Sequence, residues 1–324
     1  MGIKNLTQLI KSKAPDAIQT EGMYSLKDKT IAIDASILIY KSLANVRHNQ
    51  SYLTNKDGKV VSHIIGLFHK TIQFLSFGIK PIYIFDGKPP PEKKEVIMER
   101  NKKAHTSKLL MEQTDVLEEK QKLEKSTIRI NKEHVNDLKQ LFTLMGVPFI
   151  QPDGEAETYA AHLCKTNQVY GVYSEDMDTL SFGSPILIRN CIDRSIKRKD
   201  ALSVFSLKDI LEGFNMNYEQ FVEVCILCGC DYCETISKIG NIRAFQAIEK
   251  HNSLEAFLAT LEPTLIPPDY LQKSNKAKEL FINYSFPDYN RESPPLDTVN
   301  LTKYLVDDCG MALNRVQNAL KKIN

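Results

Sequence analysis

The sequence predicts an α/β protein with a twisted, mainly parallel central sheet and helices on both faces. Two observations carry this prediction. Short apolar runs rich in β-branched residues recur along the chain, and stretches with helical periodicity lie between them. Strands that alternate with helices in this way are typical of a parallel sheet covered on both sides.

Four apolar runs are the predicted strands. Residues 30–34 and 81–86 each end on an aspartate, and residues 169–173 and 185–189 are the other two runs. Helical periodicity predicts helices at four further places. These are residues 64–77, 133–145, 155–166 and 311–323.

The segment of residues 88–132 is dense in charge and poor in large apolar residues. One interpretation is a solvated helical excursion. The other is a mobile helical cover over a site for a polyanion, because a helix would place Lys93, Arg100 and Lys103 on one side. Pattern alone leaves both interpretations open.

The composition of the 324 residues is that of an ordinary globular protein with one large domain or two smaller ones. The net charge is only +2, so a surface for nucleic acid must come from the distribution of charge. No run approaches the roughly 18 apolar residues of a membrane span. The N-terminus lacks the layout of a signal peptide, and Leu6 stands where a myristoylation motif requires Ser or Thr. Seven cysteines without an export signal predict reduced thiols in an intracellular protein.

Seven carboxylates are candidates for one metal site. Two of them end predicted strands, at the edge where open α/β sheets bind ligands. Two lie at the start of a predicted helix, two follow another strand, and one follows an apolar stretch. The set is Asp34, Asp86, Glu155, Glu157, Asp176, Asp178 and Asp231. Converging carboxylates repel one another unless divalent cations relieve the repulsion. Two Mg²⁺ ions, roughly 3.5–4 Å apart, would activate a water and stabilise the departing oxygen of a phosphodiester.

Each of these carboxylates also has a purely structural interpretation. An aspartate after a strand is commonly a helix cap or a turn residue. A glutamate such as Glu155 also favours a helix N-terminus through the helix dipole. The repetition of the pattern, and not any single residue, indicates the metal site.

Two further motifs have open interpretations. Cys225, Cys228, Cys230 and Cys233 resemble a zinc site, but they crowd into nine residues and also fit small buried apolar side chains. Residues 235–244 are predicted to form a glycine-containing turn before a helix. This turn either binds a phosphate of a DNA duplex or is a structural helix-turn-helix corner in the core.

Several of these motifs together resemble the flap endonucleases of eukaryotic and archaeal type. The resemblance runs from Met1 to about Lys322, in the family's order and spacing. It is carried by Met1-Gly2-Ile3, Ala32-Ile33-Asp34-Ala35-Ser36, Phe85-Asp86-Gly87-Lys88-Pro89-Pro90, Gly154-Glu155-Ala156-Glu157, Glu175-Asp176-Met177-Asp178, Phe182-Gly183-Ser184-Pro185 and Gly229-Cys230-Asp231-Tyr232-Cys233.

The resemblance implies a sheet bridged by a helical arch over residues 88–132, and two Mg²⁺ ions held by the seven carboxylates, with Mn²⁺ as a substitute. It implies catalytic roles for Lys93 and Arg100 at the scissile phosphate, beside Asp178. It also implies a stacking role for Tyr40 on the terminal nucleotide, as base–aromatic stacking would suggest. The further implied DNA contacts are Gly2, Arg47, Lys103, Gly240, Arg243 and Arg315.

The sequence departs from the family pattern at three places. The turn that is commonly Gly-Ile-Gly-Pro-Lys-Arg is here Lys238-Ile239-Gly240-Asn241-Ile242-Arg243, which keeps only the middle glycine and the arginine. In the family this turn grips the duplex, and a potassium ion is associated with it, here at residues 231–240. Val61 stands where a hydroxyl residue often contacts a 3′ flap. The Gln-x-x-Leu-x-x-Phe-Phe clamp-binding box is absent from the sequence, which fits a truncated, viral or divergent member.

The resulting expectation is one nuclease domain over residues 1–324. Within it we expect an N-terminal nuclease region (1–105), an internal nuclease region (122–252) with a DNA-binding turn (231–251), and a C-terminal helical region (253–324). The expected activity is 5′-flap cleavage with 5′–3′ exonuclease action. We expect it at intracellular sites of DNA replication, in the nucleus or at a viral replication site. The expected enzyme is a monomer that binds no membrane. The rivals are an exonuclease or junction resolvase of the same superfamily, a non-catalytic DNA-binding module, and a zinc-organised binding protein.

Overall fold

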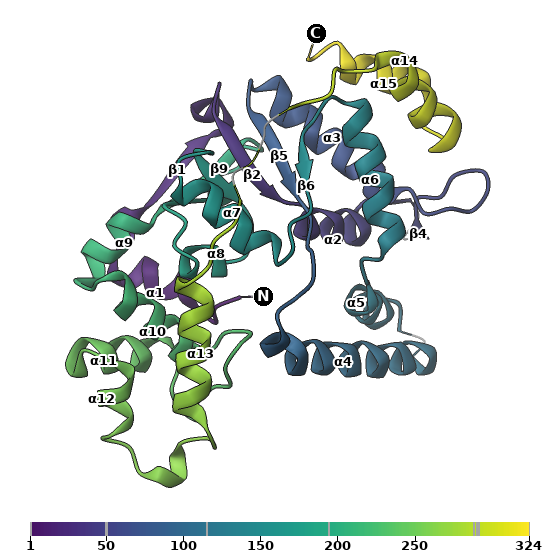
Figure 1. Ribbon diagram of the computed structural model, residues 1–324. Coiled ribbons are helices and arrows are strands. Elements are labelled where there is room, and N and C mark those ends of the chain that lie inside the picture. Colours follow the sequence, from purple (N-terminus) through teal and green to yellow (C-terminus); the bar gives the residue numbers. More distant parts are fainter. Residues whose placement is uncertain are drawn as a thin grey trace. The chain divides into compact units, whose positions relative to one another are not determined.

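The chain divides into two compact units. The computed structural model describes residues 2–48, 51–114, 116–193, 195–287, 289 and 292–323. The first unit comprises Met1–Ile33 and Gly154–Tyr289, and the second comprises Asp34–Asp153 and Asn290–Asn324. Figure 1 labels the helices and strands of both units.

The strands of the first unit pair in the order β1-β9-β8-β7-β2. Their bounds are β1 (Ile18–Gly22), β2 (Thr30–Asp34), β7 (Gly171–Tyr173), β8 (Ile186–Asn190) and β9 (Ala201–Ser206). Strands β2, β7 and β8 run parallel, whereas β9 pairs antiparallel with both β8 and β1. The side chains of Ile31, Ala32 and Ile33 are fully buried, as is typical of a parallel strand covered on both faces.

The register of the parallel strands fixes which residues share an edge. Ile31 lies opposite Gly171, and Ile33 lies opposite Tyr173. Both strands therefore end at the same edge of the sheet. Asp34 is the last residue of β2, and Asp176 and Asp178 follow β7 within five residues.

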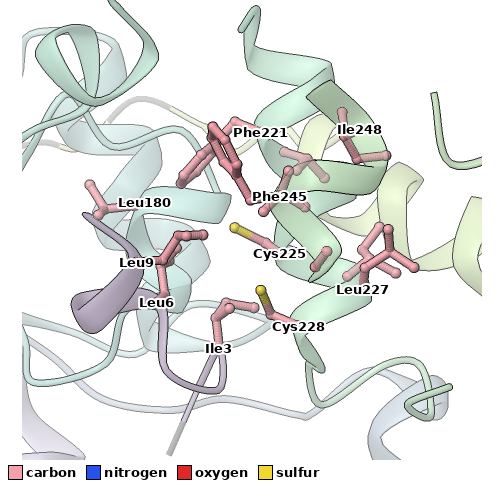
Figure 2. Packing of buried hydrophobic residues seen from close by; sticks show 14 of the residues in the cluster. Ile3, Leu6, Leu9, Leu180, Phe221, Cys225, Leu227, Cys228, Phe245 and Ile248 are labelled. Carbon is pink, nitrogen blue, oxygen red and sulfur yellow. The ribbon is translucent and has the colours of Figure 1, made fainter. Parts of the chain in front are cut away.

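Helices bury the apolar core of the first unit. They are α1 (Leu6–Lys13), α7 (Ala156–Lys165), α8 (Asp178–Ser181), α9 (Leu207–Phe214), α10 (Tyr218–Cys228), α11 (Asn241–His251), α12 (Leu254–Leu258) and α13 (Tyr270–Ile282), with short turns η1 (Pro15–Ala17), η2 (Met23–Leu26) and η4 (Pro263–Leu265). Figure 2 shows Leu6 and Leu9 of α1 packed near Phe221 and Cys225 of α10. Burial of such side chains supplies about 1.5–3 kcal/mol each.

The second unit contains the parallel pair β5 (Lys80–Ile84) and β6 (Phe149–Ile150) and the antiparallel pair β3 (Arg47–His48) and β4 (Ser51–Tyr52). Its helices are α2 (Ala35–Asn45), α3 (Ser62–Ser76), α4 (Lys94–Gln113), α5 (Leu117–Thr127), α6 (Lys132–Leu144), α14 (Thr298–Lys303) and α15 (Leu313–Leu320), with η3 (Pro91–Lys93) and the π-helical turn η5 (Tyr304–Asp308). Tyr83 of β5 stacks on Phe142 of α6 with ring centroids 4.0 Å apart.

The charged segment of residues 88–132 forms the two packed helices α4 and α5. No described side chain of α4 is fully buried, and the half-buried ones accompany the packing of α4 against α5. The prediction of a helical segment here is confirmed. The many charged residues of α4 fit this exposure, because the helix has no continuous apolar face that a core would need to bury.

The predicted mainly parallel α/β fold is confirmed, with the four predicted strands present as β2, β5, β7 and β8. The structure adds strands β1, β3, β4, β6 and β9, which the sequence pattern did not predict. The last predicted helix, residues 311–323, is shorter and spans Leu313–Leu320. Among the described residues, no helix combines the length and the apolarity needed to cross a bilayer.

Candidate metal centre and nucleic-acid interface

Three of the predicted metal ligands lie together in the first unit. One carboxylate oxygen from each of Glu157, Asp176 and Asp178 lies within 4.8 Å of the others. Asp176 and Asp178 are only 5% and 1% exposed. Negative charges held this close to one another repel unless a cation or a proton offsets them. An all-oxygen carboxylate set is the donor set that Mg²⁺ prefers.

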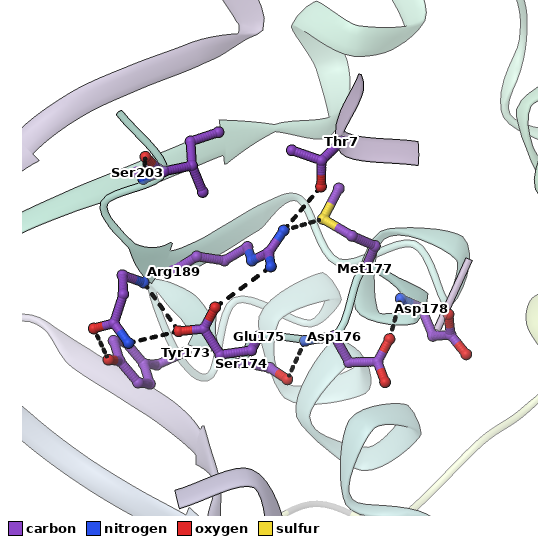
Figure 3. Close-up of polar contacts among 11 residues, drawn as sticks. Thr7, Tyr173, Ser174, Glu175, Asp176, Met177, Asp178, Arg189 and Ser203 are labelled. Carbon is purple, nitrogen blue, oxygen red and sulfur yellow. Dashed lines mark hydrogen bonds and ion pairs between the residues drawn. The ribbon is translucent and has the colours of Figure 1, made fainter. Parts of the chain in front are cut away.

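A chain of hydrogen bonds holds the loop that carries the two aspartates (Figure 3). The amide of Asp176 donates to Ser174 Oγ at 3.0 Å, and the amide of Asp178 donates to Asp176 Oδ1 at 3.2 Å. The amide of Ile3 donates to Asp178 Oδ1 at 2.7 Å. The N-terminal segment therefore orients one of the predicted ligands directly.

A second layer of contacts fixes the same loop to β8 and α1. Glu175 accepts hydrogen bonds from the amide of Asn190 at 3.3 Å and its Nδ2 at 2.7 Å. Arg189 donates to Glu175 Oε2 at 3.4 Å and to Thr7 Oγ1 at 2.9 Å. Sequence reasoning missed this role of Arg189. The available signal was a charged residue within an otherwise apolar strand.

Gly2 packs against the carboxylate cluster. A Cβ built on Gly2 would lie 1.6 Å from Asp176 Oδ1 and 2.6 Å from Asp178 Oδ1. The residue also has φ +76°, a conformation that glycine adopts without strain. Only a residue without a side chain fits here, so the expected functional glycine lies beside two of the predicted ligands.

Glu155 is the N-cap residue of α7 and accepts a hydrogen bond from the Tyr232 hydroxyl. Burial raises the pKa of Tyr232 well above its usual value, and the charge of Glu155 adds to this effect. Tyr232 therefore stays protonated and remains a donor. Asp231, its neighbour in sequence, is partly exposed after the end of α10.

Asp34 and Asp86 belong to the second unit, where one serine links them. Asp34 caps α2 by accepting from the amide of Ser36 at 2.9 Å. The Ser36 hydroxyl donates to Asp86 Oδ2 at 2.5 Å. The capping interpretation therefore holds for Asp34. Whether Asp34 and Asp86 share a site with the other five carboxylates stays a prediction.

The predicted phosphate-binding cations lie at and along α4. Lys93 is the residue directly before the helix, and Arg100 and Lys103 lie within it. Lys103 forms an exposed ion pair with Glu99 at 2.7 Å, which contributes little to stability. The carbonyl of Arg100 accepts a hydrogen bond from Arg129 at 2.8 Å, which fastens the helix to the end of α5.

Tyr40 and Arg47 contact the helix α5. The Tyr40 hydroxyl donates to the carbonyl of Lys125 at 3.1 Å, and Tyr40 is 37% exposed. Arg47 forms an ion pair with Glu124 at 2.6 Å and lies over the ring of Tyr52. In this structure both predicted DNA contacts therefore hold α5 against α2 and β3.

The glycine-containing turn forms the N-terminus of α11, with Gly240 as its N-cap residue. Arg243 donates to the carbonyl of Lys238 at 3.0 Å. Lys238 has φ +66°, which is unusual for a residue with a side chain. Arg315, the other expected basic contact, lies on α15 in the second unit.

The four crowded cysteines are structural in this fold. Cys225 and Cys228 lie in the core cluster of α10 (Figure 2). Burial raises the pKa of the Cys228 and Cys230 thiols to about 12, so both stay protonated. Within the part of the chain that the structure describes, these thiols do not converge as a metal-binding group. The zinc interpretation therefore has no support.

A buried carboxylate cluster after a strand of a mainly parallel sheet is the arrangement expected of a metal-dependent hydrolase. Models of two nuclease regions match the chain: the XPG N-terminal domain over residues 1–107 and the XPG I-region over residues 146–231. The catalytic core of Rad2 in complex with DNA substrate has the same fold, at 20% identity, a TM-score of 0.77 and full coverage of both chains. Flap endonuclease-1 of Methanococcus jannaschii also has this fold, at 24% identity, a TM-score of 0.72, and coverage of 94% of this chain and 95% of that one.

The relationship is close enough in sequence to show the family. The Flap endonuclease 1-B of Physcomitrium patens is 40% identical over 337 aligned positions, which cover 100% of this chain and 95% of the relative. The chain belongs to the flap endonuclease family. The resemblance stated from the motifs is confirmed, and with it a nuclease that acts on DNA.

Proposed function

We propose that this flap endonuclease hydrolyses the phosphodiester bond at the junction of a 5′ flap with duplex DNA, using two Mg²⁺ ions held by the seven carboxylates. The observation that carries the proposal is the mutual approach of Glu157, Asp176 and Asp178 within 4.8 Å. Bound divalent ions would supply a nucleophilic water and stabilise the departing oxygen. Mn²⁺ is the expected substitute, because it accepts the same oxygen ligands.

The protein's own contribution is to position the ligands. The amide of Ile3 and the Ser174 hydroxyl fix the loop of Asp176 and Asp178, and Tyr232 orients Glu155. Asp34, Asp86 and Asp231 complete the proposed set. These contacts lower the cost of assembling negative charge before the substrate binds.

Substrate contacts come from the arch and the turn. Lys93 and Arg100 neutralise charge on the scissile phosphate, and Lys103 and Arg47 add contacts to the DNA backbone. Tyr40 stacks on the terminal nucleotide once its contact with Lys125 is released. Gly240 and Arg243 grip a duplex arm at the N-terminus of α11, where a potassium ion over residues 231–240 would assist.

The same site acts on nicked or gapped duplex as a 5′–3′ exonuclease, and the enzyme works as a monomer at sites of DNA replication and repair within the cell. Single-turnover rates on a 5′ flap, a nicked duplex and a four-way junction in Mg²⁺ test the substrate class. We expect the flap to be cut fastest, at the flap–duplex junction, with a ligatable nick as product. A faster rate on the four-way junction would instead identify a junction resolvase.

A further inference from the structure

The helix α8 is a single turn of four residues, and Asp178 is the first of them. All four residues are buried. A helix this short is not stable alone, because one turn of hydrogen bonds does not offset the entropy lost in forming it. The carbonyls at its C-terminal end also lack partners within the helix. The position of Asp178 therefore depends on what holds the other end of α8.

Two tyrosine hydroxyls hold that end. Tyr218, the first residue of α10, donates to the carbonyl of Ser181 at 2.7 Å. Tyr284, which follows the end of α13, donates to the carbonyl of Phe182, the C-cap residue of α8. Burial raises the pKa of both tyrosine hydroxyls, so both stay protonated and remain donors. Two consecutive carbonyls at the end of α8 are thus paired from outside the helix.

Both tyrosines are fixed by their own surroundings. A capping box at Asn217 begins α10 and orders the turn that carries Tyr218. A Cβ built on Gly183 would lie 2.9 Å from the hydroxyl oxygen of Tyr218, so this close approach needs a residue without a side chain. The ring of Tyr284 packs against that of Phe182, edge to face, with ring centroids 6.0 Å apart. The hydroxyls therefore have little freedom to follow a moving α8.

The same two rings also contact the helix α7. The Nζ atom of Lys165 lies 5.8 Å from the ring centroid of Tyr218 and 5.4 Å from that of Tyr284. A cation over an aromatic ring is attracted to it. Lys165 is the last residue of α7, which carries Glu157 in its first turn and packs on α8. The tyrosine pair therefore touches both helices that supply carboxylates to the cluster with Asp176.

We propose that Tyr218 and Tyr284 are positioning residues of the metal site, whose hydroxyls hold the end of α8 and so keep Asp178 beside the other clustered carboxylates. The inference rests on the proposed function, which assigns metal binding to these carboxylates. Without the hydroxyls, two buried carbonyls lose their partners, and α8 shifts to find others. Metal affinity falls when the partners that orient a ligand are removed.

The test measures metal binding apart from cleavage. Mn²⁺ is titrated into the DNA-free full chain, and electron paramagnetic resonance gives its Kd. The variant Tyr218→Phe/Tyr284→Phe removes two oxygen atoms and keeps both rings under Lys165. We expect the Kd for Mn²⁺ to rise about tenfold, with a smaller rise in each single variant. The Mg²⁺ midpoint of single-turnover flap cleavage should rise equally, whereas the rate at saturating Mg²⁺ should stay within about threefold of wild type. General damage to the fold would instead lower that saturating rate at an unchanged midpoint.

Tyr304→Phe is the matched control, because it also removes a phenol hydroxyl that donates to a backbone carbonyl, that of Asp137 in the second unit. It should lower stability in urea without changing the Kd for Mn²⁺. A wild-type Kd and midpoint in the double variant would overturn the inference, as would equal weakening in Tyr304→Phe. If the double variant does not fold, the single variants decide by the same criterion.

Asp178→Asn, titrated in parallel, separates this inference from the proposed function. Wild-type Mn²⁺ binding in Asp178→Asn would overturn the proposed metal site and the inference with it. Weakened binding in Asp178→Asn, together with wild-type binding in the double tyrosine variant, would overturn the positioning role alone.

Discussion

At the residue scale, the carboxylates could be predicted because their chemistry repeats at strand ends and helix starts. Asp176 and Asp178 were identifiable from sequence, and the structure places both with Glu157. The contacts that support them were not identifiable, since these contacts join residues far apart in the chain. Arg189 bonds to Thr7, which lies 182 positions away. No local pattern encodes such a pair.

Gly2 gives the sharpest prediction at this scale. In Gly2→Ala, the new methyl group would collide with Asp176 and Asp178 and displace ligands. We expect the Mg²⁺ concentration for half-maximal flap cleavage to rise at least about tenfold, as is usual for losses of metal-ligand support. A Mg²⁺ titration of single-turnover cleavage measures it.

Gly58→Ala is the matched control for backbone strain. Gly58 has φ +81°, close to the value at Gly2, but its added Cβ would meet no atom within 4 Å. Its Mg²⁺ dependence should match that of wild type, with a stability loss of about 1 kcal/mol. Equal Mg²⁺ midpoints in the two variants would show that the collision at Gly2 has no consequence.

At the element scale, the predicted strands were those that are buried on both faces. β2 is apolar throughout its centre, whereas β1 is partly exposed and carries Gln19, Thr20 and Glu21. β1 therefore lacks the apolar signal, and its antiparallel pairing with β9 could not be anticipated. β6 has only two residues, too few for any periodicity. Conversely, α4 could be predicted as a charged helix. Its charge did not decide between a solvated helix and a cover over a site for a polyanion.

The turn before α11 carries a prediction about stability. Lys238 stands where the family commonly has the first glycine, and it keeps a left-handed φ of +66°. Lys238→Gly should relieve this strain and raise the free energy of unfolding by about 1 kcal/mol. The bond from Arg243 should survive, because it uses the backbone carbonyl of Lys238. Urea unfolding at fixed pH measures the change.

Asn252→Gly serves as the comparison for Lys238→Gly. Asn252 also has a left-handed φ, +64°, but asparagine tolerates this conformation better than lysine does. Its substitution should therefore stabilise less. A lower free energy of unfolding in Lys238→Gly would mean that the lysine side chain makes a compensating contact.

At the scale of the whole molecule, each unit has its own means of stabilisation. The first relies on the large apolar cluster around α10. The second adds a polar network around Asp137, which accepts from Lys59 at 2.6 Å and contacts His63 Nε2 at 3.2 Å. Tyr304 donates to the Asp137 carbonyl at 3.3 Å. The network thus joins the loop before α3 and the helices α3 and α6 to the turn after α14.

The expectation of one nuclease domain stays a prediction.

The network predicts a dependence of stability on pH. Burial alone raises the pKa of Asp137, but the hydrogen bonds from His63 and Lys59 outweigh it and hold the pKa below its usual 3.8. A depressed folded-state pKa contributes stability above pH 3.8 and loses it as the pH falls through the folded value. Asp137→Asn should therefore lower the free energy of unfolding by about 2–3 kcal/mol at pH 7. This deficit should shrink below about pH 3.8, measured by urea unfolding across pH. A deficit that stays constant into strong acid would contradict this assignment.

The central claim is that the carboxylate cluster holds the ions that cleave DNA. Its most direct test is Asp178→Asn, assayed by Mg²⁺-titrated cleavage of a labelled double flap alongside anisotropy with the same DNA. Asp193→Asn, which changes an exposed aspartate outside the cluster, is the control. We predict that Asp178→Asn lowers the cleavage rate about a thousandfold or more at saturating Mg²⁺ and leaves the DNA Kd within about threefold. Turnover by Asp178→Asn equal to that of wild type would contradict the metal assignment.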